Sequence, residues 1–194
     1  MLEVDEQLMS GLLPDTEGSR QVPTANDGAA RARERFVLFR LPSTGTSRLD
    51  ALLALLSLVK TPVSVDTGIT NLMHKFPRIT RRDVAIRHLR VLVALGFADI
   101  QQGSIFLTPD GHEFLKTSDL AILRSALISR IYGAKELLSV LRDGQPAKSD
   151  ILGLLRDAGL TRINETQANR LVEWFLLGGL IRRTGEHLVL ADED

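Results

Sequence analysis

Residues Thr80–Leu107 read TRRDVAIRHLRVLVALGFADIQQGSIFL, and their pattern changes from helical to strand-like in the middle. In the first half, apolar residues recur at the spacing of one helical face, and Gly96 stands where a C-terminal cap belongs. After Gly96, two short strand-like runs, 97–101 and 104–107, flank the turn Gln102-Gly103. This order predicts a helix followed by a β-hairpin.

Two further helices are predicted upstream. Ser47 is the expected N-cap of a nearly all-apolar helix, and Asp66 is the expected cap of a second helix that ends before Pro77. Thr80 is expected to cap the third helix, with Asp83 three residues later. Because only a few residues join the second and third helices, the pattern predicts a helix-turn-helix, whose second helix can enter a DNA major groove.

Two junctions resemble those of the winged helix-turn-helix superfamily. Residues 92–97, LVALGF, are similar to its helix-to-wing junction, and residues 107–111, LTPDG, match its LTxxG exit from the wing. The resemblance covers about 47–116 and implies a winged-helix fold. It leaves the biological role open, because the superfamily includes DNA readers, RNA-polymerase accessory subunits and chromosome-condensation adaptors that bind protein.

A weak internal repeat predicts a second unit of the same kind. A shift of 83 positions places residues 91–97 over 174–180, and Ile105 over Leu188. Upstream of that second junction, helices are expected at 134–142 and 149–158, and Asn164 with Gln167 forms the cap pair of a third.

A connecting helix is expected at 119–132. Its apolar residues face one way, which suits a buried strut between the units or a dimer contact; we favour the strut. These apolar residues are Leu120, Leu123, Leu127 and Ile131. The predicted fold class is mainly α with small β-hairpin wings (α+β). The predicted organisation is a mostly disordered acidic tail (1–45), a first winged helix (46–117), a connecting helix (118–133) and a second winged helix (134–191).

Composition excludes several classes of protein. The chain has 194 residues, 44% of them apolar, with no cysteine, so disulfides, thiolate zinc sites and cysteine nucleophiles are excluded. No apolar run reaches the ~18 residues of a membrane span, and the N-terminus is acidic where a signal peptide is basic, so we expect a cytoplasmic protein without membrane association.

Balanced charge hides two opposite blocks. The 24 basic and 24 acidic residues cancel, but 1–30 holds six acids and one base, whereas 74–90 holds six bases and one acid. The predicted DNA-binding residues come from this basic block and from the wing tip: Lys75, Arg78, Arg81, Arg82, Arg87, Arg90, Gln101 and Gln102.

Helix geometry favours DNA contact for the basic block. Arg87 and Arg90 share the stripe opposite the apolar face, and guanidinium groups bind phosphate or guanine edges bidentately. Arg78, Arg81 and Arg82 stand at the helix start, where the helix dipole disfavours positive charge, so phosphate supplies a reason for them. The alternative is a solvated basic face on which Arg87 pairs with Asp83.

The rest of the chain shows no catalytic pattern. The third helix of the second unit, within 161–175, has two bases and two acids, so we expect a docking or self-association surface there rather than DNA reading. No P-loop, dinucleotide fingerprint or metal-ligand spacing occurs, so no enzyme activity, cofactor or metal is expected. Two hypotheses remain. One is a duplex-DNA-binding protein, either a transcription regulator or the DNA-recognition subunit of a larger system such as a phage-defence complex. The other is a tandem winged-helix adaptor that holds another polypeptide.

Overall fold

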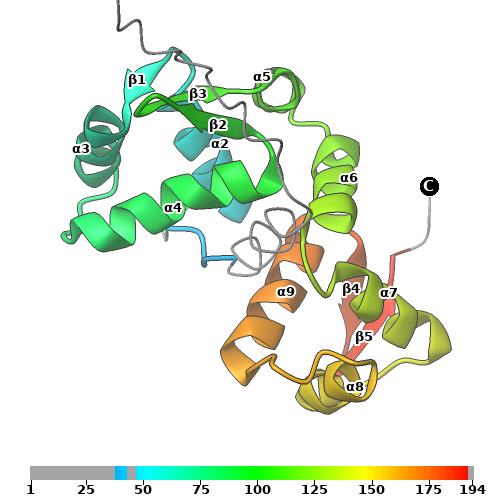
Figure 1. The fold of residues 1–194 in the computed structure, drawn as a ribbon. Helices are drawn as coiled ribbons and strands as arrows, with labels where there is room; N and C mark the ends of the chain where they lie inside the picture. Colours follow the sequence, from blue (N-terminus) through cyan, green and yellow to red (C-terminus); the bar gives the residue numbers. More distant parts are fainter. Residues whose placement is uncertain (1–37, 43–46, 192–194) are drawn as a thin grey trace, which may run out of the picture.

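The computed structural model describes residues 38–42 and 47–191 (Figure 1). The first half contains α2 (Arg48–Ser57), β1 (Val63–Ser64), α3 (Val65–Lys75), α4 (Arg82–Leu95), β2 (Ala98–Gln101), β3 (Ser104–Leu107) and α5 (Pro109–Thr117). The second half contains α6 (Leu120–Arg130), α7 (Ala134–Asp143), the short 3-10 helix η1 (Lys148–Asp150), α8 (Ile151–Asp157), α9 (Glu165–Leu177), β4 (Ile181–Thr184) and β5 (His187–Leu190). This mainly helical chain with small antiparallel hairpins confirms the predicted fold class. The expected disorder of the tail up to residue 37 lies outside the described residues.

Of the three helix starts predicted in the first half, one is confirmed and two are wrong. Ser47 caps α2 in a reciprocal capping box with Asp50. The cap of α3 is Ser64, whose hydroxyl oxygen accepts from the backbone N–H of Thr67, and not Asp66. The third helix begins after Arg81 rather than after Thr80, and no side chain caps it. At both starts an acid that was expected to serve the helix end binds an arginine: Asp66 binds Arg82, 16 residues later, and Asp83 binds Arg81, two residues before it.

The predicted hairpin is confirmed: β2 and β3 pair antiparallel, and we call this hairpin the first wing. Gly96 ends α4 in the left-handed region at φ 75°, and Gln102 and Gly103 form the two-residue turn at φ 50° and 77°. A third strand, β1, adds to the hairpin through the pair Val63 and Ile105. Two residues are too short to show a strand pattern in sequence, so β1 was not predicted.

The turn from the first wing into α5 requires a glycine at position 111, the last residue of the LTPDG stretch. Thr108 caps α5, and its hydroxyl group donates a hydrogen bond of 2.6 Å to the carbonyl oxygen of Gly96. This bond draws the start of α5 onto the end of α4. A Cβ on Gly111 would lie 1.9 Å from the carbonyl oxygen of Phe97, so only glycine fits there.

The second half repeats the local geometry of the first. Asn164 and Gln167 form the predicted capping box of α9. With the offset of 83 residues, Gly96 corresponds to Gly179, and both have positive φ values, 75° and 65°. At the same offset, Ala147 and His187 correspond to Ser64 of β1 and Ser104 of β3. Ala147 and His187 form an isolated antiparallel bridge, just as Ser64 and Ser104 pair in the first wing.

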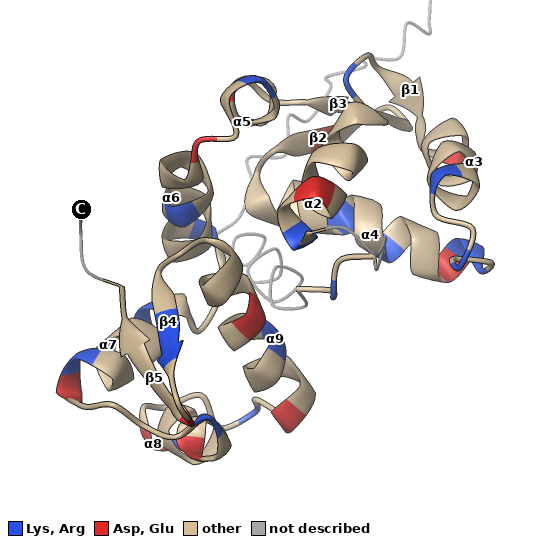
Figure 2. Cartoon of the chain, turned by 180° about the vertical axis from the view of Figure 1, so that it is seen from behind, with Lys and Arg blue, Asp and Glu red and all other residues tan. Residues whose placement is uncertain are grey.

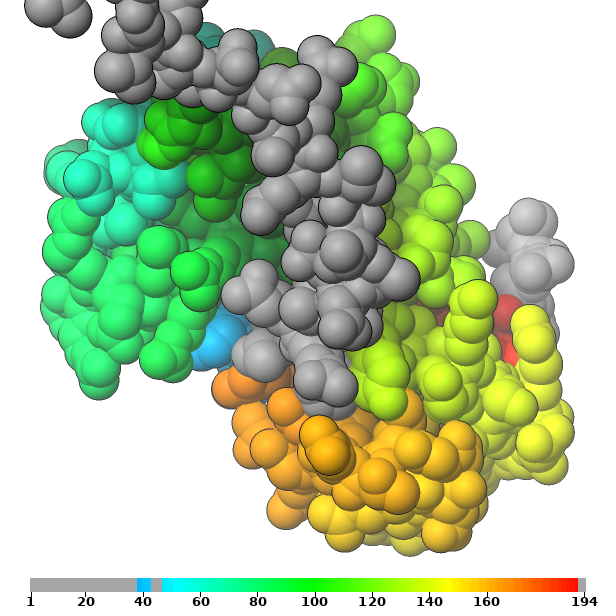
Figure 3. Space-filling view, in the orientation of Figure 1, coloured from blue at the N-terminus to red at the C-terminus, as the bar shows by residue number. Residues whose placement is uncertain are grey.

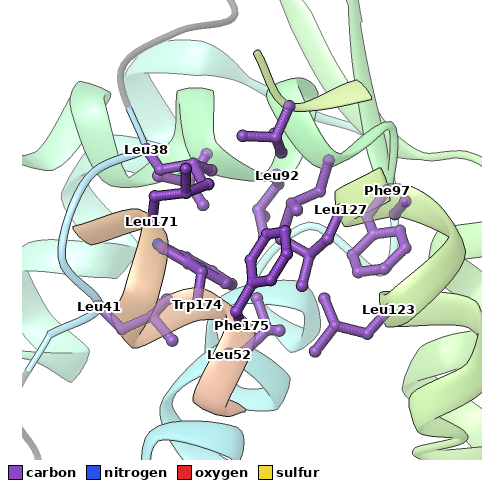
Figure 4. Packing of buried hydrophobic residues seen from close by; sticks show 14 of the residues in the cluster. Leu38, Leu41, Leu52, Leu92, Phe97, Leu123, Leu127, Leu171, Trp174 and Phe175 are labelled. Carbon is purple, nitrogen blue, oxygen red and sulfur yellow. The ribbon is translucent and has the colours of Figure 1, made fainter. Parts of the chain in front are cut away.

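The connecting helix α6 is a buried strut, as favoured from its apolar pattern. Leu123 and Leu127 are completely buried, and Figure 4 shows them gathered with Leu92 of α4 and Phe175 of α9. Most of this face is therefore covered within one chain, so its burial needs no dimer contact. One continuous core joins both halves, so their division into separate units remains a prediction. None of the described helices is long and apolar enough to cross a membrane.

The segment Leu38–Pro42 belongs to the core and not to a tail. Leu38 and Leu41 are 3% and 9% exposed. Figures 1 and 2 show the segment passing between α4 and α9. Its sequence has too few residues to show helical or strand periodicity, so its burial follows from tertiary packing alone.

Candidate nucleic-acid interface

The six predicted cationic residues lie on one continuous part of the first half. Figure 2 shows basic residues along α4 and at the turn that joins it to α3. All six are exposed, while the opposite side of α4 buries Ala85, Leu89 and Leu92. We call this set the α4 basic surface: Lys75, Arg78, Arg81, Arg82, Arg87 and Arg90.

Two members of this surface share one carboxylate. The guanidinium of Arg81 donates to both carboxylate oxygens of Asp83, at 3.0 and 2.9 Å. The guanidinium of Arg87 reaches the same carboxylate at 3.5 Å, which is the i,i+4 pair that the sequence offered as an alternative. The position of Arg87 therefore fits both a phosphate ligand and an ion-pair partner that stabilises α4 through Asp83.

A third member pairs across the helix-turn-helix. Arg82 donates to the carboxylate of Asp66 on α3. From sequence, phosphate supplied a reason for Arg81 and Arg82 near the start of α4; in the structure, carboxylates of this chain also offset their charge. Both pairs are exposed, so their contribution to stability is small and a phosphate can replace them at little cost.

The other three cations are ready for an anion. Lys75 ends α3, Arg78 lies in the turn, and Arg90 lies in the third turn of α4. Within 38–42 and 47–191, no carboxylate forms an ion pair with any of them.

The wing tip carries the two predicted glutamines. Gln101 and Gln102 are exposed, and the side-chain amide of Gln101 donates to the carboxylate of Asp99 at 3.0 Å. The tip is uncharged, so it can offer hydrogen bonds to sugar or phosphate but no counter-charge.

A buried histidine stands behind the basic surface. His88 of α4 is 6% exposed, and its Nδ1 has no hydrogen-bond partner among the described residues. Burial lowers the pKa of His88 from 6.5 to about 4, so the ring is neutral at pH 7. This ring and the ring of Phe39 pack in a T-shaped arrangement, with centroids 5.8 Å apart and planes at 85°.

The residues that the sequence analysis missed link α4 with α9. Phe39 contacts two guanidinium carbons, Cζ of Arg87 on α4 at 5.2 Å and Cζ of Arg170 on α9 at 4.9 Å from the ring centroid. Arg40 and Arg48 both bind Glu173 of α9, at 3.3 and 3.4 Å. No local pattern marks these contacts, because each joins residues that are far apart in the chain.

Comparisons with known proteins identify a fold and no family. No family model matches the chain, and no curated protein matches its sequence. One similar solved structure is described as "Crystal structure of pyrene- and phenanthrene-modified DNA in complex with the BpuJ1 endonuclease binding domain". It is 14% identical to this chain, the match covers 82% of each chain, and the TM-score is 0.55. The chain therefore shares the overall fold of that binding domain.

Proposed function

We propose that this protein binds double-stranded DNA through the α4 basic surface, with α4 in the major groove. The observation that carries the proposal is the exposed cationic side of a helix that follows a short turn and precedes a wing. This is the arrangement in which helix-turn-helix proteins present a recognition helix.

Charge placement supports contact with the phosphate backbone. Lys75, Arg78 and Arg90 have no carboxylate partner among the described residues and need no rearrangement to bind phosphate. Arg81, Arg82 and Arg87 exchange exposed carboxylates for phosphates. The uncharged wing tip then adds hydrogen bonds rather than electrostatic attraction.

The fold comparison supports the same proposal. The similar solved structure holds DNA in complex with an endonuclease binding domain. By analogy, this chain serves as the DNA-recognition part of a larger system, such as a phage-defence complex, or as a transcription regulator.

A protein-binding adaptor is the second candidate function. It is favoured by the carboxylates that already neutralise Arg81 and Arg82, and by the mixed charges of α9. An adaptor would hold another polypeptide and would not need duplex DNA.

A salt-titrated binding assay separates the two functions. With the full chain and a labelled duplex, contact with roughly five phosphates gives a slope near −4.5 for log affinity against log salt. Binding at low salt with such a slope supports the proposal. Absence of binding to duplex at low salt favours the adaptor.

A double variant locates the contact. Arg87→Ala with Arg90→Ala removes two exposed cations and leaves the apolar side of α4 intact. Affinity for DNA should fall, and the slope should become shallower by about 1.8. Arg142→Ala is the control, because Arg142 is exposed at the end of α7, outside the α4 basic surface. Equal affinity of the double variant and the wild type would contradict the assignment.

A further inference from the structure

We infer that Arg87 of α4 and Arg170 of α9, which both contact the ring of Phe39, together bind the phosphates of one DNA backbone. Both α4 and α9 then contact the DNA. The inference rests on the proposed function and extends it. It assigns to α9 a role in DNA binding, where the sequence alone predicts a docking surface.

Geometry brings the two guanidinium groups to one ring. Their Cζ atoms lie 5.2 Å (Arg87) and 4.9 Å (Arg170) from the centroid of Phe39. Phe39 belongs to the Leu38–Pro42 segment, and the space-filling view in Figure 3 shows part of this segment at the surface between α4 and α9. The pair therefore spans the seam between the two halves of the molecule.

The charges at this seam are incompletely balanced by the described residues. An aromatic ring attracts and orients guanidinium groups but carries no net charge. Arg87 shares one carboxylate with Arg81, and Arg170 forms no ion pair within the described part of the chain. Two like charges held near one ring repel each other, and phosphates of one DNA backbone bound by the two guanidinium groups relieve that repulsion.

A nearby acid does not oppose an anion here. Glu173 lies one helical turn after Arg170, and its side chain is 19% exposed. Its carboxylate is bound by Arg40 at 3.3 Å and by Arg48 at 3.4 Å. Because two cations neutralise this one carboxylate, the seam keeps a positive balance.

The ring that orients the pair is itself fixed. The carbonyl oxygen of Phe39 accepts a hydrogen bond of 3.1 Å from the indole Nε1 of Trp174. The ring of Phe39 contacts the ring of His88. The two arginines are thus placed against a ring whose position is held by contacts with α4 and α9. Guanidinium groups held in this way suit a DNA phosphate, which they bind bidentately.

The test is a salt-titrated duplex-binding assay on the full chain with Arg170→Gln. Loss of one phosphate contact should weaken binding about tenfold at 0.1 M salt and make the slope shallower by about 0.9. Arg87→Gln should behave alike, and the double variant should lose about 1.8. Arg142→Gln, the control in the same half of the molecule, should match the wild type.

The outcomes separate this inference from the proposed function. If the wild type binds and Arg87→Gln weakens binding, but Arg170→Gln matches the wild type, the inference is overturned and the proposed function stands. If the wild type does not bind duplex, the proposed function fails. A folding defect in Arg170→Gln would show in its melting temperature; Arg170→Lys, which keeps the charge, must then retain the wild-type slope, and a shallower slope would overturn the inference.

Discussion

The indole Nε1 of Trp174 donates a hydrogen bond to the carbonyl oxygen of Phe39 at 3.1 Å, across 135 positions of sequence. Trp174 is 3% exposed and lies on α9, whereas the ring of Phe39 rests against His88 of α4. This single bond therefore ties the second half of the molecule to the segment that lies on the first.

Replacement of Trp174 by phenylalanine tests that tie. The variant removes the indole donor and leaves the Phe39 carbonyl without this partner, at a cost of about 1–3 kcal/mol in the free energy of unfolding. The loss of indole volume adds to this cost. Chemical denaturation followed by circular dichroism measures the change. An unaltered free energy of unfolding would show that the bond contributes nothing.

Asp83 restrains the basic surface, so Asp83→Asn should tighten DNA binding. The substitution frees Arg81 and Arg87 and removes a negative charge that faces the phosphates. Affinity should rise about threefold to tenfold at 0.1 M salt, because Arg81 and Arg87 no longer give up a carboxylate on binding, while the salt slope should stay close to that of the wild type, since the number of phosphate contacts is the same. The loss of an acid from the first turn of α4 costs about 0.3–1 kcal/mol of stability.

Asp157→Asn controls for the overall change in charge. Asp157 is exposed at the end of α8 and forms no described ion pair. Its loss should leave affinity close to that of the wild type. Equal tightening by both variants would mean that net charge, and not the release of Arg81 and Arg87, raises affinity.

His88 should make the fold less stable in mild acid. Its pKa is about 4 in the folded chain and 6.5 as the ordinary value, so the unfolded chain takes up a proton first as the pH falls. Above pH 6.5 the neutral ring of His88 costs the fold nothing. Between pH 6.5 and about 4 the free energy of unfolding falls by on the order of 3 kcal/mol in total. Equilibrium unfolding of the wild type and of His88→Leu across this range measures it. Parallel curves for the two proteins would refute the assignment.

Gly111 and Gly153 form a matched pair of glycine substitutions. Gly111→Ala should destabilise the chain by about 1–3 kcal/mol or more, because the new Cβ would meet the Phe97 carbonyl oxygen at 1.9 Å. Gly153→Ala lies within α8 with nothing within 4 Å, so it should stabilise by about 0.5–1 kcal/mol. Melting temperatures should therefore move in opposite directions. A stable Gly111→Ala variant would show that α5 can shift away from the wing.

Local chemistry explains which features of the fold were predictable. The capping box at Ser47, the glycine cap at Gly96 and the cap pair at Asn164 depend on residues within four positions of each other. The wing follows from a two-residue turn between short strands. The predicted caps of α3 and α4 are wrong: Ser64 caps α3 while Asp66 binds Arg82 across the turn, and α4 begins after Arg81 with no side-chain cap.

In the candidate site, too, only the features set by near neighbours in the chain could be predicted from the sequence. Helical periodicity alone placed Arg87 and Arg90 on the exposed side of α4, and the structure keeps both side chains there. Periodicity could not show that Arg82 meets a carboxylate 16 residues earlier in the chain. The partners of an exposed charge depend on how neighbouring elements pack, and that information is absent from a single helix.

The sequence by itself thus determined the order of helices and hairpins and the exposed side of α4, because turns, caps and one helical face are set by near neighbours in the chain. Only the tertiary structure decided that Leu38 and Phe39 lie between α4 and α9, and that Arg170 joins Arg87 at one aromatic ring. Those contacts arise because burial of apolar surface brings distant segments together, and no local pattern records which segments meet.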